Sequence, residues 1–148
     1  MLAQQHLLDL LEAALLAGTP AWAAHVERHR SRPLPAGIDQ ALTLRVVSSA
    51  CEQIFASGSA PVQWSTRVGV ECIARAGAAV TPDAAVGPLL VDVHARITGA
   101  NATLQAAGFE LRPEVQIEWD QADLDERIGA AVFIYTVRHR TDHASLAG

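Results

Sequence analysis

The chain has 148 residues, of which 50% are hydrophobic and 18% are charged, and its formal net charge at pH 7 is −5. This length is typical of one domain and allows an ordinary core, so neither disulfides nor a structural metal is needed for folding. The acidic balance argues against a dedicated nucleic-acid binder, which normally carries a basic field. Its apolar stretches are shorter than the roughly 20 residues of a membrane-spanning helix. The apolar excess therefore suggests surface that is hidden against other protein chains.

The N-terminal segment predicts an amphipathic helix over residues 2–17. Its apolar face consists of leucines at helical spacing, Leu7, Leu8, Leu11 and Leu15. The run Gly18-Thr19-Pro20 ends the helix, because glycine accepts the left-handed cap and proline cannot continue. The segment has no basic region before its apolar residues, so it does not resemble a signal peptide, and we expect a cytoplasmic protein.

Extended structure is expected next, with a short piece at 23–28 and a strand at 42–47. The stretch Ser48–Gln63 contains Ser57-Gly58-Ser59-Ala60-Pro61 and predicts a long, mobile loop, in which Phe55 is a candidate anchor against a neighbouring subunit. A strand at 67–75 follows, with alternating dry and wet faces. The two cysteines, Cys51 and Cys72, fall in or beside strand patterns, where cysteine usually acts as a small buried hydrophobe.

The C-terminal half begins with a second helix, capped by Thr81 with Pro82 at its first position. Pro88 is expected to kink this helix or to delay its start by a turn. After an uncertain segment at 100–112, alternation predicts a strand over 115–119. An acidic link at 120–126 leads to a final strand, Gly129–Arg138, whose apolar residues on both faces indicate a central position in the sheet. The tail His139–Gly148 is expected to be frayed.

The element order is helix, three strands, helix and two strands. Runs of adjacent strands favour a single α+β domain over residues 1–148. Its sheet should be mixed or antiparallel, with about four to five strands and two main helices packed on one face.

No combination of residues indicates catalysis or a cofactor. His25 and His29 stand four apart, as do His139 and His143, but zinc requires three or four ligands and none stands at supporting spacing, so solvated histidines are the better interpretation. A general base on the wet strand face of Glu118 and Asp120 is the alternative to a solvated or interface-facing acidic strip, which we favour. The sequence has no nucleophile elbow, P-loop or dinucleotide fingerprint. We expect neither an enzyme nor a metal or cofactor site.

Alternating arginines precede Pro33 and are the most distinctive polar feature of the chain. If this segment is extended, the side chains of Arg28, Arg30 and Arg32 point to one side. They either protect a solvated edge strand or form a basic strip that meets an acidic strip of a neighbouring subunit. Both interpretations remain open. The candidate subunit-interface residues are Arg28, Arg30, Arg32, Phe55, Asp120, Asp123 and Asp125.

The whole arrangement resembles the bacteriophage tail terminators, the family of minor tail protein U. The resemblance is carried by five segments in chain order: Val26-Glu27-Arg28-His29-Arg30-Ser31-Arg32-Pro33-Leu34, Ala41-Leu42-Thr43-Leu44-Arg45-Val46, Trp64–Ala76, Asp83–Ile97 and Ala130–Arg140. It covers nearly the whole chain, and Arg32-Pro33-Leu34 with the terminal strand is its most specific part. The Gly87-Pro88 pair and the histidines of the tail depart from the family pattern.

The resemblance implies a structural protein without catalytic residues. Such proteins form a ring, typically a hexamer, that binds the last ring of the major tail tube protein, ends its polymerisation and offers a surface to the head connector. DNA passes through the lumen without sequence-specific binding. The ring would assemble in the host cytoplasm and reside in the virion tail. The alternatives are another head–tail joining protein of related fold, or a small bacterial enzyme or ligand-binding α+β domain, which a pocket with converging polar groups would favour.

Overall fold

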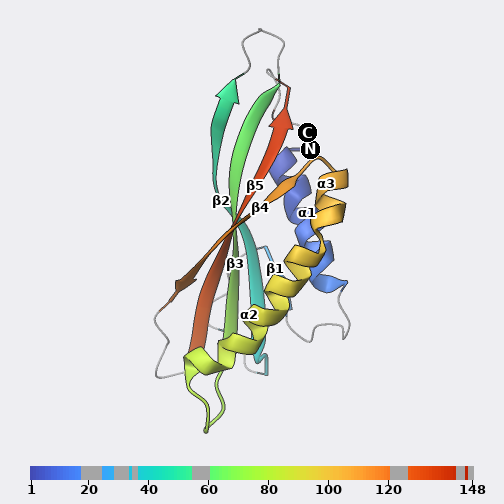
Figure 1. Cartoon of the computed structure of the whole chain (residues 1–148). Helices are drawn as coiled ribbons and strands as arrows, with labels where there is room; N and C mark the ends of the chain where they lie inside the picture. Colours follow the sequence, from blue (N-terminus) through green and yellow to red (C-terminus); the bar gives the residue numbers. More distant parts are fainter. Residues whose placement is uncertain are drawn as a thin grey trace.

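A computed structural model describes residues 1–17, 25–28, 34, 37–54, 61–120, 127–142 and 146. Its helices are α1 (Ala3–Leu16), α2 (Pro82–Gly99) and α3 (Asn101–Ala106), and its strands are β1 (His25–Glu27), β2 (Gln40–Ile54), β3 (Val62–Arg75), β4 (Glu110–Trp119) and β5 (Ile128–Thr141). The strands form one sheet in the order β1-β2-β3-β5-β4, and the helices lie along one face of it (Figure 1). The sheet is mixed, because β1 runs parallel to β2 while the other pairs are antiparallel. The α+β prediction is confirmed. None of the described helices is long and apolar enough to span a membrane.

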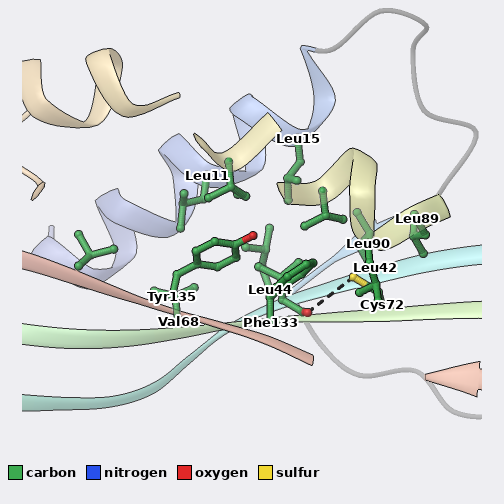
Figure 2. Packing of buried hydrophobic residues seen from close by; sticks show 14 of the residues in the cluster. Leu11, Leu15, Leu42, Leu44, Val68, Cys72, Leu89, Leu90, Phe133 and Tyr135 are labelled. Atoms are coloured by element: carbon green, nitrogen blue, oxygen red, sulfur yellow. Dashed lines mark hydrogen bonds between the residues drawn. The ribbon is translucent and has the colours of Figure 1, made fainter. Parts of the chain in front are cut away.

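The core lies between the helices and the sheet. Leu7, Leu11 and Leu15 of α1 have no exposed surface, so the predicted apolar face of this helix is confirmed. Leu11 and Leu15 lie above the rings of Phe133 and Tyr135, which β5 projects from the sheet (Figure 2). Burial raises the pKa of the Tyr135 phenol, so the ring stays neutral.

Helix α2 begins where its cap residues predict. The Thr81 side chain accepts a hydrogen bond from the amide of Ala84 at 3.4 Å, and Pro82 is the first helical residue. Pro88 lies inside the helix, so the expected late start is wrong. The turn that contains Pro88 is held in place because Val86 and Leu89 on either side of it are buried in the core.

The predicted loop at 48–63 is wrong over most of its described length. Strand β2 continues to Ile54 and pairs with β3, which already begins at Val62. The register shifts between Val46 and Ser48 and again between Cys51 and Gln53. Each bulge adds an unpaired residue that breaks the two-residue alternation, which is why the sequence pattern fades there. Residues 55–60, including Phe55, lie outside the described residues.

Strand β5 also extends further than predicted. It pairs with β3 from Ile128 to Thr141, and His139 within it is only 3% exposed, so the expectation of a frayed tail is wrong as far as residue 142. The carbonyl of Leu146 accepts a hydrogen bond from the amide of Ala3, and the two chain ends lie close together (Figure 1). Strand β5 is an inner strand, as its apolar faces predicted, while β3 holds the centre.

Candidate subunit interface

Arg28 is held within its own subunit. Its Nη2 lies 2.8 Å from Asp9 Oδ1 and 2.6 Å from Glu12 Oε2, and its Nε donates to the same Glu12 oxygen at 2.9 Å. The Arg28 side chain is 26% exposed, so part of its surface is already covered. These contacts tie the end of β1 to the outer face of α1. The position of Arg28 is therefore explained without a neighbouring subunit, whereas Arg30 and Arg32 lie outside the described residues.

Asp120 directly follows β4 and is exposed. Its backbone amide donates to the carbonyl of Ala130 at 3.1 Å, which fixes the point where the chain leaves the sheet. Asp123 and Asp125, the other residues of the predicted acidic strip, lie outside the described residues. The role of this strip at an interface stays a prediction.

Strand β4 carries apolar side chains that the fold leaves uncovered. Its register places Ile117 opposite Phe133 and Trp119 opposite Ala131, so both side chains lie on the face that the helices cover. Ile117 is nevertheless 43% exposed and Trp119 is 56% exposed. The Trp119 end of β4 splays away from the helix layer, which explains the exposure (Figure 1). Alternation in the sequence identified these residues as strand residues, but it contains no signal for how far the helices reach.

The first half of β4 has the features of a protected edge. A register shift lies between Leu111 and Val115, and Arg112 forms ion pairs with Glu110 at 2.8 Å and Glu114 at 3.8 Å. Bulges and charges are the usual means by which proteins prevent edge strands from pairing with other chains.

The second half of β4 lacks that protection. Within the described residues it pairs on one side only, with β5. We call Ile117, Glu118 and Trp119 the β4 edge surface. An exposed tryptophan beside an exposed isoleucine on an unpaired edge is more typical of a protein contact than of a solvated strand.

The opposite edge of the sheet is also largely open. Strand β1 pairs with β2 only from Ala41 to Thr43. No other described strand lies along the outer side of β2 from Leu44 to Ile54. Here Arg45 is exposed and Val47 is 38% exposed. Two different open edges on one subunit fit a head-to-tail contact, in which β4 of one copy lies against β2 of the next.

Among the described residues, no group of three or more histidine, cysteine, aspartate or glutamate side chains is placed to hold a metal ion. His94 Nδ1 lies 3.1 Å from the Tyr135 hydroxyl. The His94 ring stacks on the rings of Phe133 and Tyr135. His139 is buried, so its interpretation as a solvated histidine is wrong. Like Tyr135 and Val137, it occupies every second position of β5, on the side that is buried. This two-residue alternation is visible in the sequence.

No family model matches this sequence, and no curated protein does. The geometry and the family resemblance are therefore the grounds for a functional proposal.

Proposed function

We propose that this chain is a structural protein of a bacteriophage tail, a tail terminator that caps the tail tube, ends its polymerisation and presents a surface for head joining. The observation that carries the proposal is the β4 edge surface, in which Trp119 is 56% exposed on a strand whose outer edge pairs with none of the described strands. A subunit that functions alone gains nothing from such a surface, while a ring subunit covers it with its neighbour.

The charges on the two edges support the same assembly. Glu118 belongs to the β4 edge surface, and Arg45 lies on β2 at the other side of the sheet, just beyond the part of β2 that pairs with β1. A head-to-tail contact between β4 of one copy and β2 of the next can bring these opposite charges together. Complementary potentials favour such a contact and select the partner edge. Assembly in the host cytoplasm, a place in the virion tail and passage of DNA through the lumen follow from the same proposal.

The test is the assembly state of the full chain, measured by native mass spectrometry at high protein concentration, alone and with purified tail tubes. We expect closed rings, or rings that form on the tube ends. Trp119→Glu should abolish assembly without lowering the melting temperature, because the side chain it replaces is exposed and surface substitutions usually change stability by less than about 0.5 kcal/mol.

Val91→Glu is the matched control, because Val91 is 69% exposed on α2 and lies outside the β4 edge surface. This variant should assemble like the parent chain. A protein that stays monomeric with tail tubes present would overturn the ring. Normal assembly of the Trp119→Glu variant would show that another surface forms it.

A further inference from the structure

The strand directions determine how two copies of the sheet can join edge to edge. Strand β3 runs opposite to β2, β5 runs opposite to β3, and β4 runs opposite to β5. The arrowheads of β4 and β2 therefore point in opposite directions (Figure 1). A neighbouring copy that keeps the same strand direction, with its helices on the same side, places its β2 antiparallel to β4. Backbone pairing between the two copies is then of the ordinary antiparallel kind.

The faces of the sheet restrict which residues can oppose one another across this contact. Within one subunit, Leu44 and Ile117 lie in the same row as Phe133, on the face that the helices cover. Successive side chains of a strand alternate between the faces, so Arg45 and Glu118 both lie on the face away from the helices. Directly paired residues share a face of the sheet, and a pairing of Glu118 with Arg45 satisfies this condition.

The open part of β2 has a regular segment of the right length. Strand β1 occupies the outer edge of β2 at residues 41–43, and the first register shift of β2 lies between residues 46 and 48. Residues 44–46 remain between them, a segment as long as the β4 edge surface. An antiparallel pairing of the two segments opposes Ile117 to Val46, Glu118 to Arg45 and Trp119 to Leu44.

Other registers conflict with the described strands. A shift of two residues toward the start of β2 places Trp119 opposite Leu42, which already pairs with β1. A shift of two residues toward its end places Glu118 opposite Val47, which the bulge leaves without a partner on β3. A shift of one residue requires the neighbouring sheet to be turned over, because paired residues share a face.

The remaining register is chemically complementary on both faces. Glu118 and Arg45 are exposed, and the only contact printed by the geometry of Glu118 within its strand is with the neutral amide of Gln116, which donates to its carboxylate at 2.9 Å. Directly opposed unlike charges stabilise a pair of strands. On the other face, Ile117 and Trp119 come to lie beside the apolar residues of β2, which covers the exposed part of the β4 edge surface.

We propose that β4 of one copy continues the sheet of the next copy as an antiparallel strand on β2, with Glu118 opposite Arg45. The backbone groups of residues 117–119 and 44–46 then form hydrogen bonds between subunits. This inference rests on the ring proposed above and gives it a strand register, which the ring itself does not require.

The first test joins the two strands through a disulfide in the assembled full chain. Cys51 is exposed and Cys72 is buried, so Cys51→Ser provides the background. In that background, Glu118→Cys with Arg45→Cys should give covalent ladders of subunits under mild oxidation, because opposed residues lie within disulfide reach. Gln116→Cys with Arg45→Cys is the matched control on the same face. Its residues are diagonal neighbours about 7–8 Å apart, too far for a disulfide.

The second test exchanges the charges without a covalent bond. Glu118→Arg alone, or Arg45→Glu alone, should weaken assembly by at least about tenfold, because like charges then face each other. The double variant Glu118→Arg with Arg45→Glu restores opposite charges and should recover most of the assembly. Native mass spectrometry at high protein concentration, alone and with purified tail tubes, measures this recovery.

The outcomes separate the register from the ring. Rings that crosslink through the control pair, or a double variant that does not recover, would overturn the register and leave the ring standing. A chain that stays monomeric with tail tubes present would overturn both. Crosslinks to the tube protein in place of a second copy would assign the β4 edge surface to another partner and refute the proposal.

Discussion

Gly129 allows the backbone of β5 to approach the first turn of α2 closely. A Cβ atom added at Gly129 would lie 2.0 Å from the carbonyl oxygen of Pro82 and 2.5 Å from its carbonyl carbon, whereas real Cβ contacts are essentially never shorter than 3.0 Å. The obstructing atoms are backbone, so Gly129→Ala requires the first turn of α2 to move by about 1 Å. Such a shift disturbs Val86 and Leu89, which are buried just behind that turn. Overpacking of a core costs about 1–3 kcal/mol, and we expect the upper end here because no side chain can rotate away.

Gly99→Ala is the matched control within α2. An added Cβ there meets no atom within 4 Å outside its chain neighbours and the helix's own backbone, and alanine stabilises a helix by about 0.5–1 kcal/mol relative to glycine. The same chemical change should therefore destabilise the protein at Gly129 and stabilise it at Gly99.

Urea unfolding followed by circular dichroism measures both free energies. Since about 1 kcal/mol corresponds to roughly 2–4 °C for a chain of this size, Gly129→Ala should lower the melting temperature by roughly 6–12 °C. An unchanged urea midpoint for Gly129→Ala would refute the close approach. A loss of similar size in Gly99→Ala would show that the effect is not specific to the contact with Pro82.

Two other predictions concern buried side chains. Burial lowers the pKa of folded His139 below the ordinary histidine value of about 6.5, so the unfolded chain binds the proton more strongly. The free energy of unfolding should therefore fall as the pH drops below about 6.5, by up to about 1.4 kcal/mol per pH unit. His139→Gln should remove this contribution to the free energy of unfolding, whereas His6→Gln should retain it. Urea titrations at several pH values measure how the free energy of unfolding changes with pH, and equal slopes in both variants would contradict the assignment. Burial also raises the pKa of the Cys72 thiol, whereas Cys51 is exposed, so a disulfide reagent should label Cys51 in the native protein and Cys72 only after unfolding. Rapid native labelling of both thiols would contradict this.

The parts of the fold that the sequence predicted are those in which one local pattern decides the structure. The leucine spacing of α1 reflects burial on one face, and the Thr81-Pro82 start of α2 reflects capping chemistry. The alternation in β3 predicted a strand correctly, but the expected wet face is wrong, because Gly69 and Glu71 on that face are also buried. The extension of β2 was missed because two bulges interrupt its alternation, and pairing with β3 overrides the Ser- and Gly-rich composition nearby. The sequence predicted these local elements well and their lengths poorly.

The candidate interface was harder to predict because exposure depends on tertiary structure. Ile117 and Trp119 have the alternation of buried strand residues, and only the limited reach of the helices exposes them. Cys51 was expected to be a buried residue in or beside a strand, yet it lies within β2 and is exposed. For His139 the prediction was wrong in the opposite direction. A polar residue near the chain end is expected to be solvated, but β5 carries His139 into the core.

The position of β5 in the sheet has a consequence for folding during synthesis. Strands β2 and β3 are neighbours in the chain and can pair early, but β5 joins β3 through pairs as distant as Val62 with Thr141. Contacts between residues so far apart in sequence form slowly, because the loop entropy is lost before the contacts stabilise anything. The strand that contributes Phe133 and Tyr135 to the core is also the last described strand to leave the ribosome. Until β5 emerges, the edge of β3 that later pairs with β5 has no partner strand. Other chains can pair with this edge during that time, and it is also the place where the core closes last.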